Sequence, residues 1–407
     1  MIPFEYNFPE QQESHSFCDP SILNVAKESH IENHLVNEKG SRALGVVTVV
    51  LFVGILLSFL VNFGVTAYLG TGDLVEDYFD GEEHGEIVFS GFADTFYLSK
   101  SIRQNIAYLD YYLFNRLPSP EVILGDDSFL FPTRDVQTGY NYVADYLGEM
   151  KPTPQELKDT YDGIRAITSA YANADKQCYI VIIPNAQTVY SEKMPDYMGN
   201  ISDQTRLKMT TKYLSDDIDN YLDLTSTLIS AKENGELYNN TEDSLNSLGA
   251  YYAYLAVLDM LPDDATKDIT SVKLSENDLV SHLTVGKELA KLVSLENTIK
   301  NRTISLSTDF EQKYLILRDL IGLCDVSYAK IQYKSELPET PRIQLQFASE
   351  WDRILMIDYF SNTFGYTVYR TAVDYKPEVL SKTDASYVIL FLHEKDLGKL
   401  SDGSMLP

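Results

Sequence analysis

The segment Cys178-Tyr-Ile-Val-Ile-Ile183 is a run of six apolar residues that Pro184 and Asn185 bring to an end. It is rich in β-branched residues and has no polar alternation, which is typical of a strand buried on both faces of a parallel sheet. The preceding segment, from Thr153 to about residue 174, begins with an N-cap threonine followed by proline and is predicted to be helical. Helix followed by buried strand indicates an α/β domain.

The same alternation continues along the chain. Residues 122–131 read as a strand, a tight turn and a second strand. Helices are predicted for 203–220, 225–235 and 248–260, and further strands for 221–224, 353–357 and 387–392. The apolar segments near Tyr179, Arg353 and Tyr387 are expected to be central strands, adjacent or nearly so. The sequence therefore predicts a three-layer α/β domain with a mostly parallel sheet. A polar stretch around 262–345 is interpreted as an insertion or small subdomain.

Chemistry in such a sheet is expected at the carboxyl ends of the strands. The predicted ends are Pro184–Asn185, Asp223, Asp358–Phe360 and His393–Glu394. These positions are the first candidates for a functional site.

Residues 43–69 are 27 residues without a charge, which exceeds the ~20 apolar residues that a helix needs to cross a bilayer. Lys39 and Arg42 precede this stretch, and an acidic segment follows it. The positive-inside rule then predicts a single-pass membrane protein with a cytoplasmic amino terminus. We expect a disordered cytoplasmic tail at 1–42, a transmembrane helix at 43–69, an acidic spacer at 70–86 and an extracytoplasmic domain at 87–400.

The formal net charge of −27 argues against nucleic acid and against docking on anionic lipid headgroups. Of the three cysteines, Cys18 is expected inside the cell, which leaves Cys178 and Cys324 outside. These two either pair in an oxidising compartment or remain thiols, with Cys178 buried in its apolar run. The sequence has no Cys/His cluster, so no structural zinc is expected, and no motif calls for a cofactor.

Four segments, in order, resemble the alginate O-acetyltransferase family and its DHHW relatives. They are Val122–Phe131, Ile182–Pro195, Leu237–Tyr251 and Ile354–Phe360. The resemblance implies an SGNH-hydrolase-like domain that performs acyl transfer with a serine nucleophile, a histidine base and an aspartate that orients the base. It also implies a membrane-bound O-acyltransferase as partner and a cell-surface glycan as substrate.

The resemblance also shows a degenerate catalytic motif. Glu242 stands at the aspartate position, Ser244 at the histidine position and Leu245 at the adjoining tryptophan. Asp358 keeps the aspartate beside the nucleophile, whereas Tyr359 replaces the nucleophilic serine. A serine cannot act as a base near neutral pH, and a phenol has an ordinary pKa of ~10. We therefore expect an inactive site in which residues 242–244 share a cleft with Asp358 and Tyr359.

Three interpretations of function remain open. In the first, the chain is a catalytically inactive binding or scaffold subunit in cell-surface polysaccharide modification or export. In the second, it is a divergent O-acyltransferase or esterase with a relocated nucleophile such as Ser361. In the third, it is an envelope protein that keeps only the fold. His393 is the histidine best placed to approach a strand-end cleft, although histidines at such positions more often line a core edge.

Overall fold

The computed structural model describes residues 53, 54, 57, 99–135, 138–215, 218–317, 328–335, 341–347, 350–372 and 385–401. The chain divides into two compact units, and the unit that contains Asp110–Pro407 holds the sheets. Helix α5, Ser99–Phe114, spans the boundary between the two units. Most of the predicted transmembrane segment 43–69 lies outside the described residues. Within the described part of the chain, no helix has the length and apolar character needed to cross a membrane.

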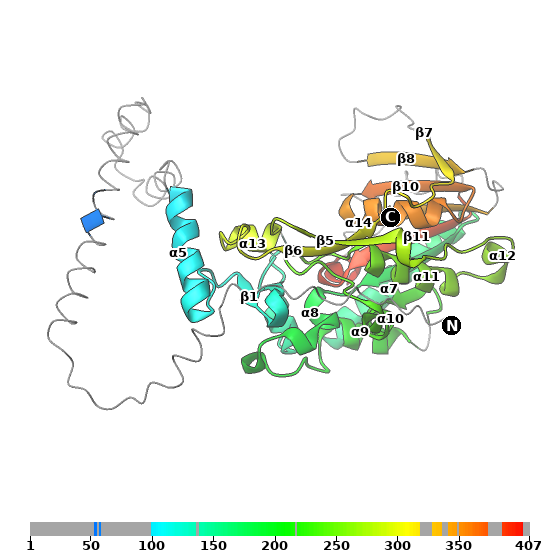
Figure 1. Cartoon of the computed structure of the whole chain (residues 1–407). Helices are drawn as coiled ribbons and strands as arrows, with labels where there is room; N and C mark the ends of the chain where they lie inside the picture. Colours follow the sequence, from blue (N-terminus) through cyan, green and yellow to red (C-terminus); the bar gives the residue numbers. More distant parts are fainter. Residues whose placement is uncertain are drawn as a thin grey trace, which may run out of the picture. The chain divides into compact units, whose positions relative to one another are not determined.

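The main sheet of the described residues has seven strands. They are β3 Gln177–Ile183, β4 Tyr221–Asp223, β7 Tyr314–Leu317, β8 Tyr328–Ser335, β9 Arg342–Phe347, β10 Tyr366–Ala372 and β11 Tyr387–His393. Their order is β4-β3-β11-β9-β10-β8-β7, and Figure 1 labels β7, β8, β10 and β11 among them. Neighbours from β4 to β10 are parallel, and β8 is antiparallel to both β10 and β7. The predicted mostly parallel sheet is confirmed.

Helices cover both faces of this sheet. On one face, α10 Thr225–Ala231, α11 Ser247–Met260 and α14 Glu350–Ser361 pack on residues such as Val181, Leu345 and Phe391. On the other face, α7 Pro154–Ala172, α9 Arg206–Leu214 and α16 Gly398–Ser401 pack on residues such as Ile180 and Leu390. The strands contribute alternate residues to the two cores, as the twofold period of a strand requires. The result is the three-layer arrangement expected from the sequence.

Local sequence signals explain several of these elements. Thr153 caps α7, because its hydroxyl accepts a hydrogen bond from the Glu156 amide while the Glu156 carboxylate accepts one from the Thr153 amide. Residues 122–131 form the predicted hairpin: β1 Val122–Leu124 pairs with β2 Leu130–Pro132 around the turn η1, Asp126–Ser128. Both the hairpin and the helix start are therefore confirmed.

The remaining short elements connect these layers. They are α6 Tyr142–Tyr146, α8 Ala186–Val189, η2 Ser191–Lys193, η3 Asp196–Met198, η4 Lys232–Asn234, α12 Asp263–Thr266, η5 Glu276–Asp278, α13 Glu288–Leu292 and η6 Glu394–Asp396. The stretch 262–345 contributes strands to two different sheets. Strands β5 Leu279–Thr284 and β6 Asn301–Leu306 form their own antiparallel pair, whereas β7 and β8 extend the main sheet. Only the first part of the presumed insertion therefore stands apart from the sheet.

One predicted strand is wrong. Residues 353–357 lie in the helix α14, and the strand that neighbours β11 is β9, just before that helix. The apolar residues of α14 divide by helical face, since Met356 and Ile357 are buried whereas Ile354 is 46% exposed. The strands near Tyr179 and Tyr387 are confirmed as β3 and β11, which pair directly.

Candidate functional site

The carboxyl ends of β3, β11 and β9 carry a cluster of polar residues. His393 is the last residue of β11, and its Nε2 lies 2.6 Å from Oδ2 of Asp352 in the first turn of α14. The imidazole is 12% exposed and the carboxylate 3%. Oδ1 of Asp352 is buried and has no hydrogen-bond partner among the described residues. The pair joins the end of β11 to α14, the helix that follows the neighbouring strand β9.

A second carboxylate, Asp243, approaches the same place from the loop before α11. Its Oδ1 accepts a hydrogen bond of 2.8 Å from the amide of Ala186, just past the end of β3. The hydroxyl of Tyr142, on α6, is hydrogen-bonded to Asp243. Burial lowers the pKa of His393, but the carboxylates of Asp352 and Asp243 raise it by more, so the net shift is upward. The two carboxylates therefore favour the charged form of the imidazole.

The residue after His393, Glu394, is the centre of a buried hydrogen-bond network. Its Oε2 accepts hydrogen bonds of 2.7 Å from the Asn185 amide and from the Thr188 hydroxyl. Burial, aided by the nearby Asp145, raises the pKa of Glu394 to about 8 although these two hydrogen bonds lower it. These two hydrogen bonds tie the end of β11 to the residues that follow β3. Glu394 is 1% exposed, so its carboxylate cannot reach a ligand.

The chemical capacity of the cluster follows from these contacts. A histidine bonded to a carboxylate is the base-and-orienter arrangement of triad enzymes. No serine, threonine or cysteine side chain is bonded to His393 in the described part of the chain. Those residues also contain no group of three or more histidine, cysteine or acidic side chains placed to hold a metal ion.

The loop that carries Glu242 and Ser244 sends neighbouring side chains in different directions. Glu242 lines a cavity of about 410 Å³ together with Lys287, Glu288 and Lys291 near α13. Burial raises the pKa of Glu242, although Lys287 opposes this effect. The Ser244 hydroxyl accepts a hydrogen bond of 3.1 Å from the Asn239 side chain. Of the two carboxylates in this loop, it is Asp243, and not Glu242 at the family aspartate position, that raises the pKa of His393.

The other two family positions lie within α14, not at a strand-to-helix turn, because the predicted strand there is a helix. Asp358 accepts a hydrogen bond of 2.9 Å from the Gln312 side chain. Tyr359 is fully buried, donates a 2.7 Å hydrogen bond to the Ser247 carbonyl and stacks on Tyr254. That Asp358 and Tyr359 share a cleft with residues 242–244 stays a prediction.

Ser361, the alternative nucleophile, is fully buried. Its hydroxyl lies 2.8 Å from the Tyr369 hydroxyl and 3.3 Å from the Thr367 hydroxyl, between α14 and β10. Ser361 therefore has no access to solvent, and its partners Tyr369 and Thr367 offer hydroxyl groups rather than a base. Asp352 and Tyr142 were missed by sequence reasoning, because Asp352 stands beside a segment that resembles a strand and Tyr142 carries no motif.

Comparison with known proteins identifies the class of this domain. Residues 122–312 match the sequence model of the SGNH hydrolase-like domain of the acetyltransferase AlgX. This match confirms the resemblance to the alginate O-acetyltransferase and DHHW family. The chain carries an acetyltransferase-like SGNH domain related to alginate O-acetylation proteins.

Several solved structures are similar to this chain. The O-acetyltransferase domain of AlgJ from Pseudomonas putida is 13% identical, with a TM-score of 0.43 over 70% of this chain and 100% of that one. A DHHW family protein from Eubacterium siraeum is 11% identical, with a TM-score of 0.46 over 71% and 100%. PatB1 from Bacillus cereus is 12% identical, with a TM-score of 0.45 over 69% and 96%. Comparison with curated protein sequences gives no match.

Proposed function

We propose that this chain is a membrane-anchored, extracytoplasmic binding or scaffold subunit that takes part in cell-surface polysaccharide modification without transferring the acyl group itself. The observation that carries the proposal is Ser244. It stands where the family motif has its histidine, and its hydroxyl is engaged by Asn239. A hydroxyl in that place cannot accept a proton near neutral pH, so the loop lacks the histidine base of the family motif.

The one imidazole at the strand ends does not replace that base. The Nε2 atom of His393 is bonded to Asp352, and no serine, threonine or cysteine side chain among the described residues is bonded to the ring. The pair therefore lacks a nucleophile to activate. The cluster retains hydrogen-bonding capacity, which suits it to hold a polar ligand or partner.

The purified full chain should therefore hydrolyse p-nitrophenyl acetate no faster than buffer with heat-inactivated protein. It should also transfer no acetyl group from that donor to an oligosaccharide. Ser244→His is the matched variant, and it should also stay at background, because Tyr359 still stands in place of the nucleophilic serine. Turnover by the wild type would overturn the proposal.

A second candidate function is favoured by the 2.6 Å contact between His393 and Asp352. In this alternative the pair acts as general base on a water molecule, and the domain is a divergent esterase of a cell-envelope glycan. Ester hydrolysis that increases with pH through the pKa of His393, and disappears in His393→Gln, would support it. Equal background rates for wild type and His393→Gln would exclude it.

The proposed anchor is the apolar stretch 43–69, with residues 1–42 inside the cell. The basic flank of Lys39 and Arg42 and the acidic far side support this topology. An impermeant thiol reagent on intact cells should spare Cys18 and label Glu82→Cys. Labelling of Cys18 alone would reverse the topology. Purification of the tagged chain from detergent-solubilised membranes should bring down a multispanning O-acyltransferase, and its absence would leave the scaffold role without its partner.

A further inference from the structure

A hollow of about 480 Å³ lies beside the β1–β2 hairpin, away from the strand-end cluster. One wall is the hairpin with the residues before it, and the other is the turn at Pro195–Tyr197. The volume falls within the ~300–1,000 Å³ range of small-ligand sites. It is therefore large enough to hold part of an extended ligand.

The most exposed large apolar side chain among the described residues lines this hollow. Tyr197 is 79% exposed, whereas the next, Leu283, is 67% exposed. An exposed aromatic ring next to polar groups is typical of binding surfaces, because the ring gives contact area at little entropic cost. A flat ring also packs well on the C–H face of a pyranose.

Charged residues line the same hollow as the Tyr197 ring. They are Arg116, Asp126 and Asp196, and all three residues are exposed. Their carboxylate oxygens can accept hydrogen bonds from sugar hydroxyls, and the guanidinium can donate to ring or hydroxyl oxygens. An aromatic platform flanked by donors and acceptors matches a polyhydroxylated ligand better than a purely apolar one.

The charge of the residues that line the hollow favours neutral saccharides over anionic ones. Two carboxylates and one guanidinium give the hollow a net negative charge, and the chain as a whole carries −27. A polyuronate would be repelled, because like charges at close range cost free energy. The ligand that fits is a neutral oligosaccharide.

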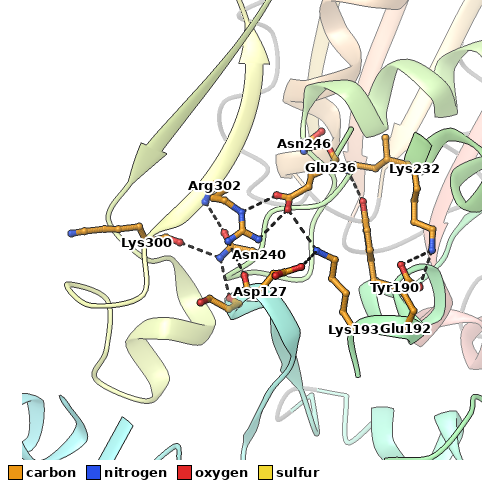
Figure 2. Close-up of polar contacts among 12 residues, drawn as sticks. Asp127, Tyr190, Glu192, Lys193, Lys232, Glu236, Asn240, Asn246, Lys300 and Arg302 are labelled. Carbon is orange, nitrogen blue, oxygen red and sulfur yellow. Dashed lines mark hydrogen bonds and ion pairs between the residues drawn. The ribbon is translucent and has the colours of Figure 1, made fainter. Parts of the chain in front are cut away.

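The two walls are held together by an ion-pair network (Figure 2). Lys193 lies 3.2 Å from Oδ2 of Asp127 in the hairpin turn and 3.7 Å from Glu236. Arg302 binds both carboxylate oxygens of Glu236, at 3.0 and 3.1 Å, and donates to the Asp127 carbonyl. The Lys193 ammonium also sits 4.2 Å from the centre of the Phe129 ring. This network fixes the hairpin turn to the segment that leads to Tyr197.

Backbone packing reinforces that attachment. Gly125 stands at the start of the hairpin turn, and a Cβ added there would lie 2.4 Å from the Lys193 carbonyl oxygen. Only glycine permits this approach of hairpin and turn. The hollow is thus preorganised, which reduces the entropy lost when a ligand binds.

We propose that the hollow lined by Arg116, Asp126, Asp196 and Tyr197 is a binding subsite for a neutral oligosaccharide. This inference rests on the proposed role as a subunit that acts on a cell-surface glycan. It names the part of the domain that would contact the polymer and the charge class of that polymer.

The test is calorimetric titration of the full chain in a detergent without a sugar headgroup. The probes are cellohexaose and N-acetylchitohexaose as neutral oligosaccharides, and hexamannuronate as the anionic one. We expect at least one neutral probe to bind and hexamannuronate to bind at least tenfold more weakly. Tyr197→Ala should weaken the neutral probe at least tenfold, and Asp196→Asn should weaken it severalfold.

Tyr213→Ala is the matched control, because Tyr213 is a half-exposed tyrosine on α9 outside the hollow. It should bind the neutral probe like the wild type, and equal melting temperatures should show that all variants fold. Failure of both neutral probes, unchanged binding by Tyr197→Ala or tighter binding of hexamannuronate would each overturn the subsite. Ester hydrolysis by the wild type would instead overturn the proposed function and leave this subsite standing.

Discussion

His393 and Asp352 join the end of the central strand β11 to the first turn of α14 through a contact of 2.6 Å between Nε2 and Oδ2. The two residues are 41 positions apart, and the strand of Asp352's own segment, β9, is the direct neighbour of β11. The imidazole at the end of β11 is thus bonded to the helix α14, which follows the adjacent strand β9 in the chain. The predictions below begin with this pair.

Asp352→Asn should lower the pKa of His393. The substitution removes the nearest carboxylate, which raises this pKa, and leaves burial, which lowers it. Titration of the imidazole C–H resonances by NMR measures the change, and His282, exposed on β5, is the internal control. A His393 titration that is unchanged in Asp352→Asn would show that the contact does not govern its charge.

Glu394→Gln should flatten the dependence of stability on pH. The folded-state pKa of Glu394 is about 8, against an ordinary value of ~4.3, so the folded protein holds a proton that the unfolded chain releases. Stability is then greatest at low pH and falls as pH rises from about 4.3 to about 8, by at most about 1.4 kcal/mol per pH unit for one group.

Urea unfolding between pH 5 and pH 9 measures this slope, and Glu149→Gln, at an exposed carboxylate, should leave it unchanged. Glutamine can still accept the hydrogen bonds from Asn185 and Thr188 through its amide oxygen. His393 has a raised pKa, so its contribution is also lost as pH rises through that pKa, and this part of the slope should remain in the variant. Identical slopes in wild type and Glu394→Gln would contradict the assignment.

Tyr359→Ser should destabilise the fold without creating an active site. The ring is fully buried against Tyr251 and Tyr254, so its removal leaves a cavity that costs about 3–5 kcal/mol. Tyr359→Phe should cost only about 1–2 kcal/mol, for the lost hydrogen bond to Ser247. Urea unfolding gives both values. If Tyr359→Ser is stable and hydrolyses acetyl esters, position 359 is the site of the nucleophile and the prediction is wrong.

Gly163→Ala should destabilise the domain although alanine is the better helix former by about 1 kcal/mol. A Cβ at this position of α7 would lie 2.0 Å from the Leu400 carbonyl oxygen, so α16 would have to move. In a chain that ends at residue 397 the clash is absent, and the same substitution should become neutral or stabilising. Ala166→Gly, on the exposed side of α7, should cost about 1 kcal/mol in both chains.

The fold could be predicted from the sequence where burial was uniform. Strands β3 and β11 are apolar throughout, and their segments matched the pattern of a buried parallel strand. Strand β9 was missed because its residues alternate: Gln344 and Gln346 lie between apolar neighbours, as in a half-exposed strand, yet both are buried. The apolar run 353–357 was mistaken for a strand because five residues are too few to separate the two periods.

The candidate site was predicted only in outline. His393 was recognised as a strand-end residue because β11 was recognised. Its partner Asp352 was not, since the helix that carries it was read partly as a strand. The contact of Asp243 with the end of β3 was missed for another reason: adjacent side chains of a loop point in different directions, and spacing in the sequence does not tell which one lies against the sheet.

The strand order has a consequence for how the domain is made. Strand β11 lies between β3 and β9, yet it comes after every other strand of the main sheet along the chain. During synthesis, β3 can pair with β4 early, but about 200 residues separate it from its other neighbour, β11, so the centre of the sheet forms last. Contacts this distant in sequence slow folding, because the loop between them must be closed first. A nascent chain halted before Tyr387 would expose two further strand edges, one on β3 and one on β9, and such edges bind chaperones or start aggregation.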